Sequence, residues 1–165
     1  LKADLNATSL VVVGDDGALN REVVEVLHAQ LDYAPLHTAA IVEQAGGGEA
    51  DPDARAATEA VVFESLCDNV RCCISTSGGG TGAAARAACW QHLHGHVTVW
   101  LEVLDGAEEA GGGGAKPQNE AYEASEIHVR LTAAQAADRG EVAEAVLQAA
   151  QALLRKDDEL VKKKQ

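Results

Sequence analysis

An apolar run in the first part of the chain stops at a glycine and leads into a helical pattern. Ser9–Val13 reads SLVVV and is followed by Gly14. A short, continuous, β-branched run of this kind is typical of a strand buried on both faces of a parallel sheet. Apolar residues then recur at helical spacing, at Val23, Val24, Leu27 and Leu31. They predict an amphipathic helix over about 20–31 that packs back onto the strand.

Strand and helix patterns continue to alternate after this unit. Three further runs predict strands at Arg71–Thr76, His96–Val103 and Glu126–Leu131. Helices are expected after a cap at Asp53, over Ala83–Leu93, and from about Val142. The first of these helices is predicted to turn four residues to the core: Ala57, Val61, Val62 and Leu66. Because parallel strands need helical crossovers, the alternation predicts a three-layer α/β fold with a mainly parallel sheet and helices on both faces.

Length and charge limit the classes of function. The 165 residues can bury one core but not two ordinary ones, so a single domain over 1–165 is expected. A formal net charge of -13 repels nucleic acid, which is therefore not an expected partner. There is no run of about 20 apolar residues and no recognisable signal or transit peptide, which predicts a soluble chain without membrane insertion.

The glycine turn after Ser9–Val13 lies where a phosphate-binding loop would lie. In the P-loop pattern G-x-x-x-x-G-K-[ST], backbone N–H groups surround a phosphate, the lysine pairs with it, and the hydroxyl holds magnesium. Here the window from Gly14, which includes Gly17, reads GDDGALNR. Leu19 stands in place of the second motif glycine, Asn20 in place of lysine, and Arg21 in place of serine or threonine. These residues predict a degenerate P-loop.

Two aspartates in the same turn, Asp15 and Asp16, oppose phosphate binding further. At an effective dielectric near 20, a carboxylate about 4 Å from a phosphate charge costs on the order of 4 kcal/mol. Arg21 could offset this only by reaching back. The alternative interpretation is a tight acidic turn, in which Asp16 lies near the positive end of the following helix.

Several segments are similar, in their order and spacing, to the shikimate kinase family. They are the turn at Gly14, IVEQ at Ile41–Gln44, SGGG at Ser77–Gly80, VTVWLEV at Val97–Val103 and YEASEIHVRL at Tyr122–Leu131. The resemblance covers most of the chain and implies a P-loop kinase-like fold. In an active member it would also imply ATP and magnesium, phosphorylation of the shikimate 3-hydroxyl, and a substrate held by an aspartate, by arginines and by the GGG turn.

The chain departs from the family at most of these substrate-binding positions. The Asp-x-Asp pair expected before IVEQ falls on His37 and Ala39, so the carboxylate is absent, and His37 is expected to be a surface or loop histidine. The expected arginines fall at about Ala56 or Ala57 and on Gln118.

The family's lid would occupy 104–119, which is a Gly-rich acidic segment here and is expected to be a flexible lid remnant. Only Gly78, Gly79 and Gly80 remain of the substrate-binding elements. They are either a residual ligand turn or glycines that permit a sharp backbone turn.

The neighbouring histidines and the adjacent cysteines are interpreted as structural residues. His92, His94 and His96 alternate around Gly95 at a helix-to-strand junction, which favours a solvated loop over a metal site. Cys72 and Cys73 are adjacent in a predicted buried strand and would point to opposite faces, which favours core packing. The four cysteines of the chain show neither a disulfide rhythm nor a metal spacing, which indicates a reducing compartment.

The losses together predict a non-catalytic shikimate-kinase-like domain, with no catalytic residue and no bound cofactor. Similarity to the catalytically degenerate plastid branch of the family implies a chloroplast location and a role in plastid biogenesis or regulation through an unknown protein partner. In some members of that branch the kinase-like domain is one domain of a longer protein, and the resemblance implies the same possibility for this chain. Two alternatives stay open: an active ATP- and magnesium-dependent shikimate kinase rebuilt around Arg21 and the GGG turn, and a small-ligand sensor that uses this turn without chemistry.

Overall fold

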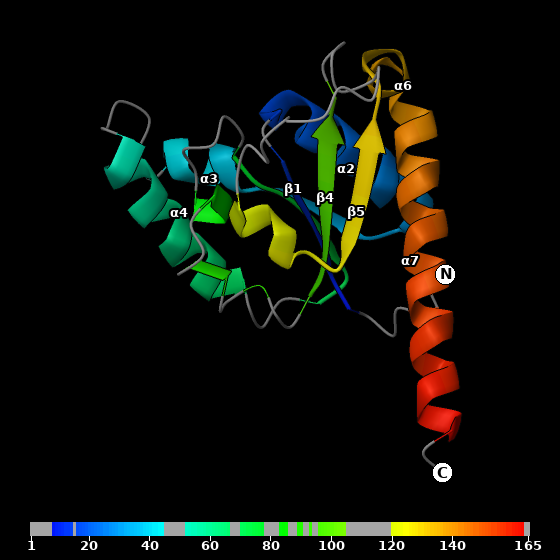
Figure 1. Cartoon of the computed structure of the whole chain (residues 1–165). Helices are drawn as coiled ribbons and strands as arrows, with labels where there is room; N and C mark the ends of the chain where they lie inside the picture. Colours follow the sequence, from blue (N-terminus) through cyan, green and yellow to red (C-terminus); the bar gives the residue numbers. More distant parts are fainter. Residues whose placement is uncertain are drawn as a thin grey trace.

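Five parallel strands form the central sheet of the molecule (Figure 1). This computed structural model describes residues 8–14, 16–44, 52–66, 70–77, 83–85, 89–90, 93, 96–104 and 120–163. The strands are β1 (Leu10–Val13), β2 (Ala34–His37), β3 (Cys72–Ser75), β4 (Val97–Val103) and β5 (Ile127–Leu131). Their order across the sheet is β2-β3-β1-β4-β5, and every neighbouring pair is parallel.

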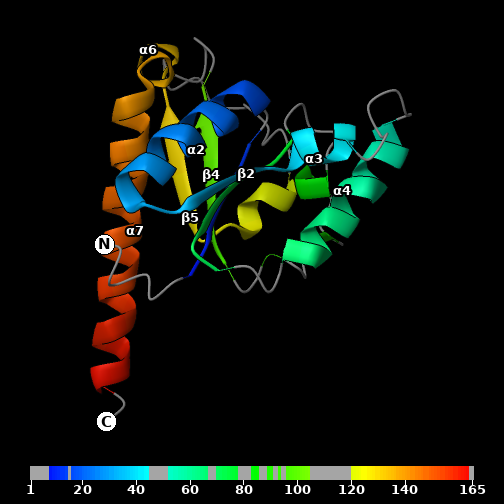
Figure 2. The ribbon, with the colours of Figure 1, turned by 180° about the vertical axis from the view of Figure 1, so that it is seen from behind.

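Helices cover both faces of this sheet (Figure 2). One face carries α2 (Gly17–Leu31) and α7 (Arg139–Lys163), and the other carries α3 (Thr38–Gln44) and α4 (Pro52–Leu66). The shorter elements are η1 (Ala83–Ala85), η3 (Glu120–Ala124) and α6 (Ala133–Ala137). The predicted three-layer α/β fold is confirmed. In the described part of the chain, no helix combines the length and the apolar character needed to cross a membrane.

The two faces of β1 belong to two different hydrophobic cores. Leu10 and Val12 pack with α2 and α7, whereas Val11 and Val13 pack with α3 and α4. All four side chains are fully buried. β1 is the middle strand of the sheet and is covered on both sides, which explains why its sequence is a continuous apolar run rather than an alternating one.

The four strands predicted from the sequence occur within one residue of their expected bounds. The pattern predicts neither β2 nor α3. β2 reads APLH, lies at the edge of the sheet, and is exposed at its first two residues, Ala34 and Pro35. Proline is accepted at a sheet edge because one side of an edge strand makes no ladder hydrogen bonds.

Two helix predictions need correction at their bounds. α2 begins at Gly17, three residues before the expected start, because Asp16 caps it. Residues 83–93 were expected to form a helix, but the described residues of this segment form the 3₁₀ turn η1 and no α-helix.

The predicted core face of α4 is wrong for two of its four residues. Val62 and Leu66 are buried as expected, but Ala57 is exposed and Val61 is 65% exposed. Apolar residues surround almost the whole helix, so their spacing does not single out one face. The helix begins at Pro52, so Asp53 lies inside it rather than at its cap.

Candidate functional site

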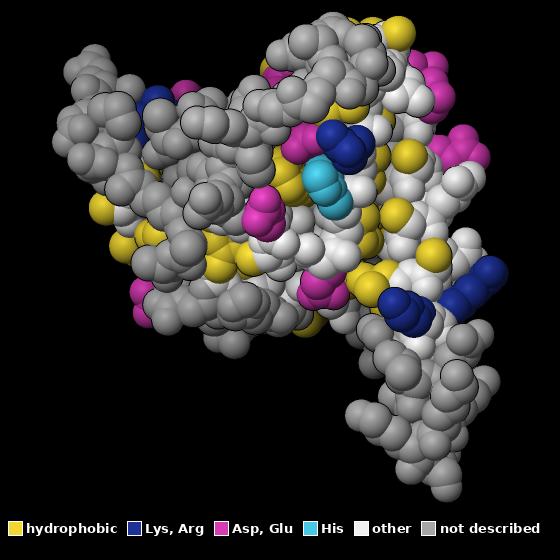
Figure 3. Space-filling view, in the orientation of Figure 1, with side chains coloured by type: hydrophobic (Ala, Val, Ile, Leu, Met, Phe, Trp, Pro, Cys, Tyr) yellow, Lys and Arg dark blue, Asp and Glu magenta, His cyan; other side chains and the backbone are white. Residues whose placement is uncertain are grey.

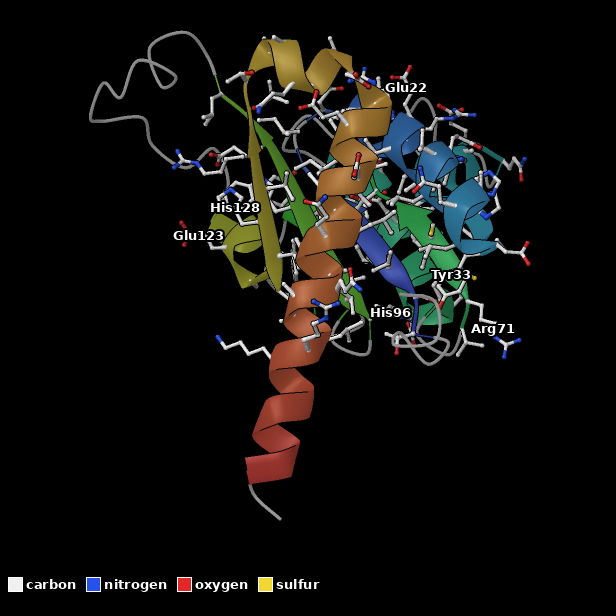
Figure 4. The ribbon with its side chains drawn as sticks, turned by 90° about the vertical axis from the view of Figure 1, so that its right-hand side faces the viewer. Glu22, Tyr33, Arg71, His96, Glu123 and His128 are labelled. Atoms are coloured by element: carbon white, nitrogen blue, oxygen red, sulfur yellow. The ribbon has the colours of Figure 1, made fainter. Side chains whose placement is uncertain are left out.

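The carboxyl ends of β1, β2 and β3 meet at one edge of the sheet, where α/β proteins bind their ligands. The residues that follow these strands are Gly14, Thr38 and Thr76. Figure 4 shows Glu22 of α2 at this end of the molecule, with Tyr33, Arg71 and His96 toward the opposite end. The candidate site is therefore the set of polar groups around Gly14, Thr38 and Thr76.

The turn after β1 is held by Asp16. The Asp16 side chain accepts a hydrogen bond from the backbone N–H of Leu19 at 3.0 Å, and its carbonyl oxygen accepts one from the N–H of Asn20, also at 3.0 Å. The bond to Asn20 is the first backbone hydrogen bond of α2, whereas the N–H of Leu19 has no partner within the helix and is satisfied by the Asp16 side chain. Asp15 lies outside the described residues.

Leu19 and Asn20 are both fully buried. Leu19 belongs to the core between the sheet, α2 and α7. The Asn20 amide Nδ2 donates to the carbonyl oxygen of Gly14 at 3.1 Å and to that of Thr76 at 3.3 Å, whereas its Oδ1 has no hydrogen-bond partner within the described part of the chain. Asn20 thus joins the ends of β1 and β3 with a neutral amide. Arg21 is exposed on the outer side of α2.

Gly14 permits a close approach between this turn and β4. Its φ is 155°, and a Cβ atom there would lie 2.5 Å from the carbonyl oxygen of Leu101 and 3.2 Å from Asn20 Oδ1. No side chain fits in that space, so a glycine is required at the end of β1. The close packing against Leu101 is therefore enough to account for the glycine, and no bound ligand is needed to explain it.

A buried carboxylate, Glu59 of α4, lies at the same edge and was missed by the sequence prediction. It accepts hydrogen bonds from Thr38 Oγ1 at 2.6 Å, from the N–H of Ser77 at 3.0 Å and from the N–H of Ala83 at 2.7 Å. A buried carboxylate needs several such donors to offset its lost hydration. A glutamate on the same helical face as Ala56 and Phe63, both buried, is the sequence sign that could have revealed it.

Glu59 binds the backbone on both sides of the predicted ligand turn. Ser77 precedes Gly78, Gly79 and Gly80, and Ala83 follows them. The three glycines themselves lie outside the described residues, as do 105–119 of the predicted lid remnant, with Gln118 among them.

His37 is the last residue of β2, so it lies in an edge strand rather than a loop, and its partly exposed side chain takes part in a hydrogen-bond network. Its Nδ1 lies 2.7 Å from Ser75 Oγ, and its Nε2 lies 2.7 Å from Glu25 Oε1. The other oxygen of Glu25 lies 3.1 Å from His28 Nε2. The hydrogen bond from His37 lowers the pKa of Glu25, although partial burial opposes the shift.

The two strand cysteines pack as the alternation predicts. Cys72 belongs to the core beside α4, and Cys73 to the core beside α2. Burial raises the pKa of the Cys73 thiol to about 12, which keeps it protonated and unreactive at neutral pH. His92 and His94 lie outside the described residues, and no group of three metal ligands occurs among the residues described. His96 is buried just before β4, so the expectation of a solvated loop is wrong for this histidine.

Charged side chains also gather over β4 and β5, where Figure 3 shows a histidine between acidic and basic groups. His128 stacks on Trp100, with ring centroids 4.0 Å apart and an interplanar angle of 6°. Glu102 lies 3.5 Å from His128 and 3.1 Å from Arg130. The Glu102 carboxylate offsets the charge of Arg130 locally, so this group of side chains does not make an open anion site.

The chain is similar in sequence to one named plant protein. It is 36% identical over 112 residues to "Probable inactive shikimate kinase like 2, chloroplastic" of Arabidopsis thaliana. The match covers 64% of this chain and 29% of that relative, so the chain spans less than a third of the relative's length. No protein-family model matches the chain.

Solved structures share the fold at low sequence identity. A shikimate kinase from Acinetobacter baumannii in complex with shikimate matches with a TM-score of 0.69 and 18% identity, over 92% of this chain and 97% of the other. A shikimate kinase from Aquifex aeolicus matches with a TM-score of 0.67 and 15% identity, over 87% and 96%. At these identities the likeness is one of fold.

Proposed function

We propose that the chain is a non-catalytic member of the shikimate kinase family, and that its turn after β1 does not bind a nucleotide phosphate. The observation that carries the proposal is Asn20. Asn20 stands where the P-loop pattern has its lysine. Its amide is buried, and both of its donated hydrogen bonds go to protein carbonyl oxygens.

The backbone donors of the turn support the same proposal. A P-loop binds phosphate through N–H groups that point to the ligand. In this chain the N–H groups of Leu19 and Asn20 already donate to Asp16. A phosphate would have to displace the Asp16 carboxylate and would meet no lysine to offset the repulsion between the two negative charges.

The substrate positions support the loss of activity separately. His37, which stands where the family resemblance places an aspartate, is held between Ser75 and Glu25 and offers no carboxylate. Ala56, at one of the expected arginine positions, is buried in the core. The defect is therefore distributed over several elements, and Asn20→Lys alone should not create a kinase.

For the biological role, we propose plastid biogenesis or regulation through a protein partner. The name of the plant relative, inactive and chloroplastic, supports both the location and the absence of catalysis. Because the chain spans less than a third of that relative, the activity and partners of the whole protein are part of this proposal.

Calorimetry with ATP and magnesium, followed by a phosphoryl-transfer assay with shikimate, tests the proposal. We expect no heat of ATP binding and no turnover under conditions in which an active shikimate kinase gives both. Turnover at the 1–100 s⁻¹ typical of kinases, to order of magnitude, would refute the proposal and support the alternative of an active enzyme.

A small-ligand sensor is the second candidate, and Glu59 favours it. By fixing Ser77 and Ala83, this carboxylate holds the backbone on each side of Gly78–Gly80. Shikimate binding without turnover would support the sensor. Binding of neither ligand, together with a reproducible partner in a pulldown, would support the interaction domain.

A further inference from the structure

Three side chains from three elements form one hydrogen-bonded line beside the edge of the sheet. Ser75 ends β3, His37 ends β2, and Glu25 lies on α2. The register of the two strands pairs His37 with Ser75, which brings their side chains to the same face. Ser75 Oγ lies 2.7 Å from His37 Nδ1, and His37 Nε2 lies 2.7 Å from Glu25 Oε1.

The carboxylate of Glu25 determines which nitrogen of His37 carries a hydrogen. An ionised carboxylate only accepts hydrogen bonds, so the Nε2 of His37 must carry a hydrogen. In a neutral imidazole Nδ1 is then an acceptor, and Ser75 Oγ–H donates to it. His28, which lies 3.1 Å from the second oxygen of Glu25, holds the carboxylate in place.

We propose that Ser75 is an activated nucleophile toward small acyl esters, with His37 as its general base and Glu25 as the positioning residue for His37. Attack forms a bond between Ser75 Oγ and the acyl carbon, while the Ser75 proton moves to His37 Nδ1. The ester C–O bond then breaks, and the leaving alkoxide takes the proton from His37. Attack by water on the acyl-serine, with the proton again passing through His37, releases the acid and restores Ser75.

The burial of Ser75 limits this reaction to small reagents, and the lack of free backbone donors beside it makes hydrolysis of the acyl-serine slow. Ser75 is 4% exposed, whereas the side chains of His37 and Glu25 are 13% and 49% exposed, so the line leads from the interior to the surface. Of the N–H groups after Ser75, that of Thr76 donates to Val12 and that of Ser77 to Glu59. Neither is free to stabilise an oxyanion, a contribution worth about 10²–10³-fold per donor. Water should therefore release the acyl group from the acyl-serine only slowly.

This inference is independent of the proposed function. It uses neither Asn20 nor a nucleotide, and a chain that binds no ATP can still carry a reactive serine. Conversely, an unreactive Ser75 leaves the proposal of a non-catalytic shikimate-kinase-like domain unchanged.

Labelling of the whole folded chain with a small fluorophosphonate tests the proposal. The probe forms an Oγ–P bond with an activated serine and releases fluoride, and mass spectrometry of the peptides locates it. We expect modification at Ser75, and with p-nitrophenyl acetate a release of about one p-nitrophenolate per chain followed by slow turnover. Ser65, an exposed serine on α4 whose hydroxyl donates to the Val62 carbonyl, is the internal control in the same molecule.

Variants separate the roles in the line. Ser75→Ala should abolish labelling at this position, and His37→Asn should slow it about 10²–10⁴-fold, the range for a lost general base. Glu25→Gln should slow it by a smaller factor, and Ser65→Ala should leave the Ser75 rate unchanged. Labelling of wild-type Ser75 no faster than that of Ser65 would overturn the proposal without any variant. An unchanged Ser75 rate in folded His37→Asn would overturn it too.

Discussion

The side-chain amide of Asn20 donates to the carbonyl oxygen of Thr76, a residue 56 positions away in the chain, over a distance of 3.3 Å. With its second hydrogen bond, to the carbonyl oxygen of Gly14, Asn20 connects the first turn of α2 to the ends of β1 and β3. The residue that the sequence comparison with the P-loop pattern sets against the lysine is here part of the hydrogen bonding between the ends of β1 and β3.

Asn20→Asp should destabilise the fold strongly. The substitution keeps the shape of the side chain but removes the donor, and it places a carboxylate beside two buried carbonyl oxygens. Leaving such buried groups unpaired costs about 1–3 kcal/mol each, so a loss of at least about 3 kcal/mol is expected in urea denaturation. Arg21→Ala, at the neighbouring exposed position, should change stability by less than about 0.5 kcal/mol. Equal effects of the two substitutions would contradict the role given to Asn20.

Gly14→Ala should cost about 3 kcal/mol, because the new Cβ would lie 2.5 Å from the Leu101 carbonyl oxygen. Gly140→Ala is the matched control. A Cβ at Gly140 would lie an ordinary 3.5 Å from Asp138 Oδ1, and this glycine lies in the first turn of α7. The control should be neutral or stabilising by up to about 1 kcal/mol. Chemical denaturation of both variants measures the difference, and a tolerated alanine at position 14 would show that the close approach is not tight.

Glu59→Gln should destabilise the domain by about 3 kcal/mol, because one carboxylate oxygen that accepts hydrogen bonds becomes an amide group that cannot. The donors left unpaired include the buried N–H of Ala83 or that of Ser77. Glu64→Gln on the exposed side of the same helix should be close to neutral. Thermal unfolding of the two variants side by side is the measurement. A Glu59→Gln variant as stable as Glu64→Gln would mean that the buried network contributes little.

His96 should make stability fall at mildly acidic pH. Burial lowers the pKa of His96 below its ordinary value of 6.5, despite an opposing hydrogen bond to the backbone of Leu66. The unfolded chain therefore binds the proton more readily than the folded chain, and stability falls as the pH drops below 6.5 toward the lowered pKa. Denaturation midpoints of wild type and His96→Asn over this range provide the test. A wild type that loses no more stability than the variant would contradict this assignment.

The sequence was sufficient to predict the layers of the fold and the strands β1, β3, β4 and β5, because apolar runs and helical spacing of apolar residues indicate burial directly. It was insufficient for β2, where an exposed edge carries only the short segment APLH, and for the face of α4, where apolar residues occur on every side. In the site, the departure from the P-loop pattern can be predicted from the sequence. The polar contacts of Asn20, Glu59 and His37 cannot, because all their partners except Gly14 are 12 to 56 positions away and only the folded sheet brings them together.

The burial of Leu19 has a consequence for the evolution of this chain. A glycine at position 19, as a phosphate loop requires, would remove a leucine from the core at a cost of about 2–5 kcal/mol. That is a large share of the roughly 5–15 kcal/mol by which a domain is stable. Any route from this turn to a phosphate-binding loop would therefore pass through variants that fold poorly before they gain any activity. Selection for a stable fold is by itself enough to keep a leucine at position 19.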